Sequence, residues 1–366
     1  MMRAEKITSV QLGLILFTFV VSTINLSVPG QMAMFGKQDA WLSVFPSVTT
    51  GLLCIWVMIK LGKRYPGLTI IEYSSQIVGK WAGKLIGVNY IYYWFVSITT
   101  ITYQHSMFIN TLLLPKSPHL VGSMTLLILC GFAVYAGIEV VGRSNEFLTP
   151  LLMAFVFPLF ILTLQEIHPN NFKPILGDGF WPVLQGAVLP ACAFMNQLFI
   201  LGWLLPFSNQ PKKARKVALI ALAGITGILL TVVSLSILVL GPLTGRLSYS
   251  FLSVIQYIGI EGSFERLEAI AVSIWVMGCF VKSAICLFIL CLCVSQLFGI
   301  RDYRDLVFPC TLLATLGSVW IFRNGADLQN YIVFTFPILA LFNQSIIPLL
   351  LLVIDTIRRK AVASRH

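Results

Sequence analysis

Long apolar runs separated by short polar joins dominate the chain. A transmembrane helix needs about 20 mostly apolar residues. Ten runs come close to or exceed that length: residues 9–34, 40–61, 84–114, 120–138, 147–165, 181–206, 216–240, 266–298, 306–322 and 331–357. The pattern predicts an all-α integral membrane protein with ten transmembrane helices. Because the joins are too short to hold a separate enzyme domain, the protein must act within or beside the bilayer.

The composition supports a lipid environment. Hydrophobic residues make up 57% of the chain and charged residues 11%, against about 25% charged in an average soluble domain. The first apolar run is long and lacks a small-residue cleavage site, so we expect it to stay in the mature chain as a helix rather than to be removed as a signal peptide.

The net charge of +11 is sorted by loop. When alternate loops are assigned to opposite sides, one side holds 18 of the 25 Lys and Arg residues, and Lys282 is the only one buried in a span, away from its ends. Cytoplasmic loops carry the excess of basic residues, so both termini are expected in the cytoplasm and no nucleic-acid partner is expected. The remaining six, on the other side, are Lys37, Lys116, Lys173, Arg246, Arg266 and Arg323.

Two spans carry helix-breaking sequence in their middle. The first contains Ser22 to Ser27 followed by Pro29-Gly30, and the sixth contains Gly186 to Ala193 around Pro190. Proline cannot continue a regular helix without loss of backbone hydrogen bonds, although proline and glycine are also common in membrane helices that are merely kinked. We interpret both spans as broken helices.

The broken spans lie five apart, as do the two longest runs, the third and the eighth. An odd offset reverses the direction of each partner, which is typical of an inverted repeat of five plus five helices. The predicted halves are residues 1–180 and 181–366. Paired broken helices predict a binding site at the bilayer midplane. Residues 247–263, between the seventh and eighth spans, are too polar to span and are expected to form an outer interfacial or lid segment.

Lys282 is the one basic residue near the centre of a span. A central lysine costs about 2.5 to 3.5 kcal/mol on insertion scales, so it should face the protein interior. Three interpretations remain open: the ammonium replaces a coupling cation between spans one and eight, it holds a ligand carboxylate, or it is a structural pin against unwound carbonyls.

Other chemistry is sparse. The sequence has no nucleotide-binding loop, no hydrolase elbow, no zinc-protease motif and no paired carboxylates at catalytic spacing. An enzyme is therefore not expected, nor is a cofactor. The eight cysteines lie in apolar runs without a CxxC motif and are interpreted as small hydrophobic residues rather than metal ligands. No carboxylate lies at the depth of Lys282, which disfavours an acidic proton relay.

Five local patterns, in order along the chain, carry a resemblance to a known family. They are Pro29 with Asp39-Ala40-Trp41; Ile71-Glu72-Tyr73; Gly79-Lys80; Gly137-Ile138-Glu139 with Arg143, Glu146 and Pro150; and Trp275 with Phe280-Val281-Lys282. Together they resemble the B subunit of spore germinant receptors, the endospore germination permease family. The chain departs from that pattern at Asn25-Leu26-Ser27, where a more glycine-rich break is usual.

The resemblance implies a LeuT-like fold related to the amino acid/polyamine/organocation transporters and a role in nutrient sensing. It also implies an inner spore membrane location beside an A subunit and a lipoprotein C subunit. Glu139, Arg143 and Glu146 are expected to hold inner helix ends together. The leading hypothesis is a receptor subunit that binds an amino acid or sugar; the alternatives are a secondary transporter of amino acids or amines, and a channel. The predicted ligand-binding residues are Thr23, Asn25, Ser27, Tyr103, Cys192, Ala193, Phe194, Lys282 and Ser283.

Overall fold

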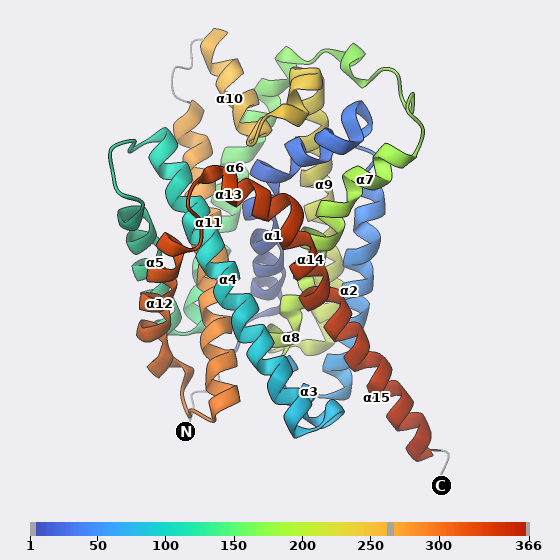
Figure 1. Cartoon of the computed structure of the whole chain (residues 1–366), viewed down its shortest axis with the longest axis vertical. Helices are drawn as coiled ribbons and strands as arrows, with labels where there is room; N and C mark the ends of the chain where they lie inside the picture. The colour runs from blue at the N-terminus through green and yellow to red at the C-terminus, as the bar shows by residue number, and fades with distance from the viewer. Residues whose placement is uncertain (1–4, 262–266, 364–366) are drawn as a thin grey trace.

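The computed structural model describes residues 5–261 and 267–363, without the side chains of residues 25–27, 259–261, 267, 268, 362 and 363. The described chain is a bundle of helices (Figure 1). Its first half contains α1 (Ser9–Gly36), α2 (Val44–Arg64), α3 (Ile70–Val78), α4 (Lys80–Leu112), α5 (His119–Ala136) and α6 (Ile138–Thr163). Its second half contains α7 (Trp181–Leu189), α8 (Leu201–Leu204), α9 (Ala214–Leu240), α10 (Ser250–Glu261), α11 (Leu267–Phe298), α12 (Val307–Trp320), α13 (Gly325–Asn330), α14 (Phe336–Ala340) and α15 (Ile347–Ala363).

The helices make this a multi-pass membrane protein. In the described part of the chain, seven helical segments are long and apolar enough to cross a membrane, and the bent α1 makes eight. The two other predicted spans correspond to α4, which is long but more polar, and to α12, which has only 14 residues. At about 1.5 Å per residue α12 rises roughly 21 Å, less than the roughly 30 Å hydrocarbon core. Helices therefore lie at all ten predicted positions, and eight of them have the length and hydropathy typical of a membrane span.

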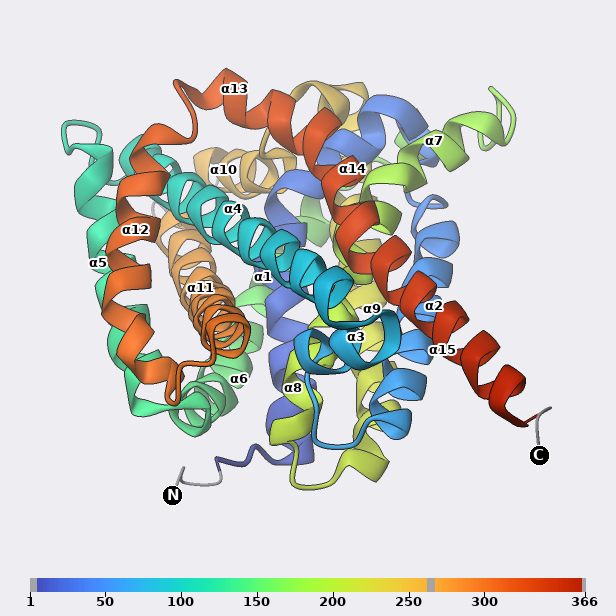
Figure 2. The same cartoon turned by 60° about the horizontal axis from the view of Figure 1, so that its bottom comes forward.

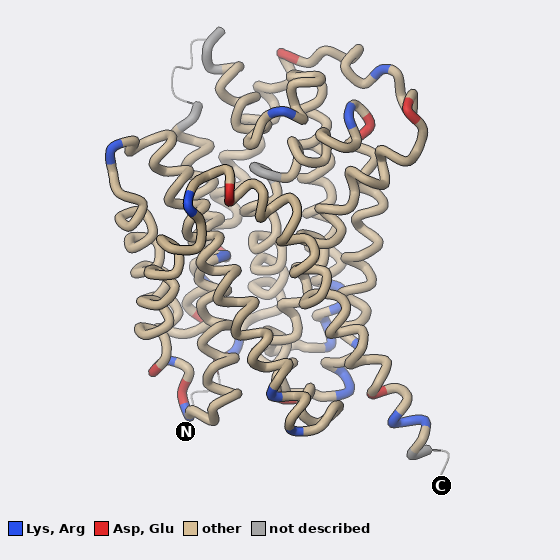
Figure 3. The backbone as a smooth tube through the Cα atoms, in the orientation of Figure 1, with Lys and Arg blue, Asp and Glu red and all other residues tan. Residues whose placement is uncertain are grey.

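The two ends of the bundle differ in their content of basic residues. Both chain ends lie at the same end of the bundle (Figure 1), and most Lys and Arg residues gather there (Figure 3). We call this end the basic face. The short helix α3 lies on it, where Thr69 and Glu72 form a reciprocal cap: the backbone N–H of Thr69 donates to Glu72 Oε2 at 2.8 Å. Figure 2 brings this end forward.

The first and sixth spans are both irregular. The segments Ser9–Ile24 and Val28–Asp39 of α1 are inclined by 61° to each other. In the sixth span, α7 passes into a π-helical turn at Pro190–Phe194 and a 3-10 segment at Met195–Ile200 before α8. Pro190 lacks a backbone N–H, and π turns of this kind gather at functional sites. The break therefore lies slightly later than the predicted Gly186 to Ala193 segment.

The tenth span is irregular as well, which the sequence pattern did not indicate. Two π-helical turns, Tyr331–Thr335 and Leu341–Ile346, flank α14. The second contains two buried amides whose partners lie on α4: Asn343 Oδ1 accepts from Asn89 Nδ2 at 2.6 Å, and Gln344 Nε2 donates to the Tyr93 hydroxyl at 2.6 Å. These contacts fix the tenth span against α4.

The segment after the seventh span forms α10 at the end opposite the basic face (Figure 1). Its residues Phe251, Val254 and Ile255 are buried, and the helix packs on α1, α9 and α11. The predicted outer segment thus covers the bundle as a packed helix; its last two residues, 262 and 263, lie outside the described residues.

Candidate functional site

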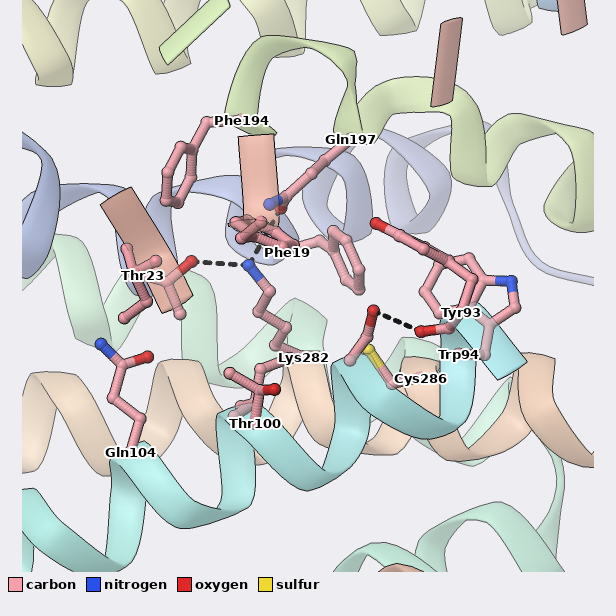
Figure 4. Close-up of a pocket in the computed structure, with 14 residues that line it drawn as sticks. Phe19, Thr23, Tyr93, Trp94, Thr100, Gln104, Phe194, Gln197, Lys282 and Cys286 are labelled. Carbon is pink, nitrogen blue, oxygen red and sulfur yellow. Dashed lines mark hydrogen bonds between the residues drawn. The ribbon is translucent and has the colours of Figure 1, made fainter. Parts of the chain in front are cut away.

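An internal cavity of about 50 Å³ lies where the irregular parts of the first and sixth spans meet α4 and α11 (Figure 4). A buried space of this size holds water molecules but is smaller than the pockets that normally enclose small-molecule ligands. The cavity is lined by Phe19, Thr23, Tyr93, Trp94, Ser97, Thr100, Ile101, Gln104, Phe194, Gln197, Lys282, Cys286, Ile332 and Phe336.

Lys282 joins three spans at this cavity. Its side chain, on α11, is 3% exposed, and its ammonium donates to Thr23 Oγ1 at 2.6 Å and to Gln197 Oε1 at 2.9 Å (Figure 4). The Gln197 amide is oriented by its own bond, Nε2 to the Ala193 carbonyl at 2.8 Å. One buried cation therefore connects α11 to the irregular first and sixth spans.

The charge of Lys282 is stabilised by neutral groups. The ammonium lies 4.9 Å from the centre of the Phe19 ring and 5.9 Å from that of Phe194, within the range of cation–π attraction. No carboxylate lies among the described residues that line the cavity. Because a buried charge is costly unless it is paired, this lysine is suited to a ligand that brings a negative group.

Two further hydrogen-bond donors lie on the cavity wall without a partner. Gln104 Nε2 and Trp94 Nε1 are both buried, and neither has an acceptor in the described structure. Buried polar groups are nearly always hydrogen-bonded in native proteins. The two donors lie ten residues apart on α4, about 15 Å along the helix, and on opposite sides of Lys282 (Figure 4).

An aromatic cluster separates the cavity from the basic face. Trp94 and Phe199 are stacked with ring centroids 5.3 Å apart, and Trp203 stands perpendicular to both. Trp203 Nε1 donates to Cys293 Sγ at 3.1 Å, which ties the cluster to α11. On the other side, Phe194 packs edge-on against Phe336 at 6.2 Å. Aromatic side chains thus flank the site on two sides.

The predicted site residues take different places. Thr23, Phe194 and Lys282 line the cavity. Ala193 is buried beside it and contributes its carbonyl to Gln197, as described above, whereas the half-buried Cys192 lies outside the lining.

Four more predicted positions lie away from the lining or outside the described residues. Tyr103 stacks on His119 at 5.6 Å and packs against Phe322 at 5.2 Å. Ser283 is fully buried with an unpartnered hydroxyl. The side chains of Asn25 and Ser27 lie outside the described residues.

The lining residues that sequence reasoning missed include the polar Gln104 and Gln197 and the cluster residues Tyr93 and Trp94. A signal existed for Gln197, because the Asn196-Gln197 pair interrupts an apolar run just after the proline break. Cys286 could have been found from helical spacing, since it lies one turn after Lys282.

A second polar network holds the start of α1 at the basic face. The Glu5 carboxylate accepts from the Ile138 backbone N–H at 3.0 Å and from the Tyr303 hydroxyl at 3.0 Å, and it forms an ion pair with Arg304. The Tyr303 pKa is raised by burial and by the neighbouring Glu5 charge. The loops before α6 and α12 are thereby tied to the first span.

The α6 residues that were predicted to hold helix ends together, Glu139, Arg143 and Glu146, also lie at the basic face. Glu139 Oε1 accepts from the Lys6 backbone N–H at 2.8 Å, and Glu146 Oε2 accepts from Gln11 Nε2 at 3.0 Å. Arg143 pairs with Glu139 at 3.8 Å on the surface. These contacts bring together the ends of α1 and α6 at the basic face.

The arrangement defines a membrane protein of the LeuT-fold class, with a small central cavity between broken spans. Solved structures of this fold superpose over most of the chain. A substrate-bound Na⁺-coupled sialic acid symporter gives a TM-score of 0.61 at 13% identity, covering 91% of this chain and 78% of that one. MhsT in complex with L-phenylalanine gives 0.65 at 13% identity, covering 94% and 98%.

The chain belongs to the spore permease family, described as spore germination protein, whose sequence model matches residues 6–324. Two relatives come from Bacillus subtilis: spore germination protein YndE is 27% identical, covering 97% of this chain and 98% of the relative, and spore germination protein KB is 26% identical, covering 98% and 97%. The resemblance predicted from the five local patterns is confirmed.

Proposed function

We propose that this protein is the nutrient-sensing membrane subunit of a spore germinant receptor and that its ligand binds in the cavity at Lys282. The main supporting observation is the buried Lys282 ammonium. It donates to Thr23 and Gln197, and no carboxylate lies among the described residues that line its cavity. The family membership supports a role in nutrient sensing or transport. The class of ligand, the step that triggers germination and the partner subunits are the parts that we add as a proposal.

Of the three interpretations of Lys282, the arrangement favours the ligand-binding one. The ammonium is held by neutral acceptors and aromatic rings, and no carboxylate lies among the described residues of the lining. A ligand carboxylate would accept from the ammonium, and charge-assisted hydrogen bonds are the strong ones. We therefore propose an amino acid, or a sugar with acceptors in the same positions, as the nutrient.

Binding must be accompanied by opening. The cavity of about 50 Å³ is smaller than the pockets that enclose small-molecule ligands. A nutrient would shift an existing equilibrium between this state and one with a larger cavity, by no more than its difference in affinity for the two states. Such coupling amounts to about 1 to 3 kcal/mol.

The proposal also includes the orientation of the chain in the membrane and its partner subunits. Both termini lie with most of the basic residues (Figure 3), so the positive-inside rule favours a cytoplasmic location for that face. We place the protein in the inner spore membrane, with the A and C subunits of the receptor reading its conformation. Residues 1–180 and 181–366 would then be the two inverted repeats that meet at the cavity.

A secondary transporter of amino acids or amines is the alternative, because the fold is shared with Na⁺-coupled and other symporters and a fold alone does not determine function. The cavity lining disfavours the amine version, since Lys282 would repel a cation and no acidic residue of the lining would hold one.

Matched ligand pairs test the proposed chemistry. Each amino acid is compared with its decarboxylated amine for thermal stabilisation of the purified chain, using wild type, Lys282→Met and the surface variant Lys84→Met. We expect stabilisation by the amino acids alone, lost in Lys282→Met and kept in Lys84→Met. Equal stabilisation by the amines, or an unaltered Lys282→Met response, would contradict a carboxylate bound at Lys282.

A further inference from the structure

A groove with a volume of about 500 Å³ runs along the lipid-facing side of the bundle near the basic face. Its floor is the first part of α1, where Val10 is 60% exposed. Its walls come from α6 and α9, and its lining is apolar apart from one serine and one threonine. The lining residues are Ser9, Val10, Gly13, Leu14, Phe17, Thr149, Pro150, Met153, Val217, Ile220, Ala221 and Gly224.

The groove exists because α1 packs closely on α9 while α6 stays apart from α9. A Cβ added at Gly13 would lie 2.6 Å from Val217 Cγ1, and one at Gly224 would lie 3.1 Å from the Phe17 ring. The glycines therefore let the two backbones approach. The remaining side of α1 is left open to the membrane between its two neighbours.

Two lysines, Lys213 and Lys216, lie at the end of the α9 wall that is nearest the basic face. Lys213 and Lys216 precede Val217 and Ile220 by four residues, so they occupy the same helix face one turn nearer the basic face. Both lysines are exposed, and neither forms an ion pair in the described part of the chain. Lys212 and Arg215 are also exposed, but Lys212 lines a different pocket with Lys6 and Lys63, and Arg215 precedes Leu219, which lies outside the groove.

We propose that the groove binds one acyl chain of an anionic phospholipid whose phosphate pairs with Lys213 and Lys216. Basic clusters at the cytoplasmic ends of membrane helices attract anionic headgroups. The apolar lining suits an acyl chain, and the two exposed lysines suit the negative headgroup.

The lipid would act on the nutrient site through α1. The helix whose first turns form the groove floor continues to Phe19 and Thr23, which line the cavity. An acyl chain in the groove stabilises the packing of α1 seen here and so opposes its movement. This regulatory consequence rests on the proposed function: nutrient affinity should change at least about fivefold between phosphatidylglycerol and phosphatidylcholine bilayers.

Native mass spectrometry of the purified full chain measures the lipid site without any nutrient. Phosphatidylglycerol and phosphatidylcholine with the same acyl chains compete for the protein. We expect the anionic lipid to be retained preferentially and its affinity to fall at least about tenfold in Lys213→Gln/Lys216→Gln. In the matched control Lys212→Gln/Arg215→Gln it should change less than about threefold.

A second pair of variants tests the groove itself. Val10→Trp fills the floor and should remove the retained lipid, whereas Leu219→Trp, on the lipid-facing side of α9 outside the groove, should not. Equal losses in the two double variants, or full retention in Val10→Trp, would overturn the proposal. So would efficient crosslinking between copies through Val10→Cys in phosphatidylglycerol vesicles, because a second chain would then occupy the groove. None of these outcomes depends on nutrient binding, so they leave the proposed function untouched.

Discussion

The Lys282 ammonium donates to the Thr23 hydroxyl across 2.6 Å, and this contact joins α11 to α1 one residue before the first straight segment of α1 ends at Ile24. The position of α1 is thereby coupled to the charge at the centre of the cavity. A ligand that accepts a hydrogen bond from the ammonium in place of Thr23 therefore also alters the contact that holds the first span.

Replacing Lys282 by Met should lower nutrient affinity by about ten- to a hundredfold, the equivalent of a hydrogen bond to a charged group of about 1.5–3 kcal/mol. Folding should survive because Met nearly conserves the side-chain volume and removes a costly buried charge. The measurement is nutrient titration of the purified chain beside its melting temperature. An impaired fold with a normal response in the surviving protein would instead identify Lys282 as a structural pin.

Thr23→Val separates the ligand site from general stability. The substitution removes the acceptor of the Lys282 ammonium at nearly constant volume. Thr18→Val is the matched control, because Thr18 lies on the same helix and its buried hydroxyl bonds to Thr149 at 2.7 Å, away from the cavity. Each should cost about 1 kcal/mol of stability, but only Thr23→Val should change nutrient affinity. Equal effects on affinity would argue against a site at Thr23.

Filling the cavity should abolish the response. Ser97 lines the cavity and is only half-buried, so Ser97→Phe adds volume where the neighbours can adjust, with an overpacking cost of about 1–3 kcal/mol. Thr125→Phe, at an exposed position on α5, serves as control. Loss of binding in both variants, or in neither, would place the nutrient elsewhere.

Glu5→Gln should loosen the start of α1. The neutral amide loses the charge-assisted bonds to Ile138, Tyr303 and Arg304, which are roughly twice as strong as neutral ones. Hydrogen exchange of the backbone amides of residues 9–20 should become at least about tenfold faster, corresponding to about 1.4 kcal/mol. Glu139→Gln, whose side chain is 39% exposed, should change exchange by less than threefold, about 0.6 kcal/mol. Unaltered exchange in Glu5→Gln would show that this network does not hold the helix.

Cysteine labelling tests the orientation. None of the eight native cysteines, all in the described part of the chain, is exposed, so Lys360→Cys and Lys116→Cys supply the reactive thiols. A membrane-impermeant reagent added outside intact cells should label Lys116→Cys and spare Lys360→Cys. The reverse pattern would invert the predicted topology.

The sequence predicted the fold well where the bilayer dictates the pattern. Spans of about 20 apolar residues, the proline breaks near Pro29 and Pro190, and the length of α4 and α11 all follow from that constraint. The site was predicted less completely. Lys282 is conspicuous because charge in a span is costly, but Trp94 and Ile332 belong to the cavity only through packing between distant spans.

Other departures have a similar cause. The π turns of the tenth span depend on amide contacts between Asn343 and Asn89 and between Gln344 and Tyr93, more than 250 positions apart in the chain. Hydrophobic periodicity reports burial along one helix and carries no information about such partners. Tyr103 is an example of a residue that was predicted to bind the ligand but does not line the cavity. Its ring packs instead with His119 and Phe322.

The most direct test of the central claim is the binding and uptake of radiolabelled amino acids, sugars and nucleosides by the purified chain in sealed liposomes, with Lys282→Met alongside. The account predicts saturable binding of at least one nutrient without accumulation inside the vesicles, and loss of that binding in the variant. Accumulation inside the vesicles would identify a transporter and contradict a subunit that only senses.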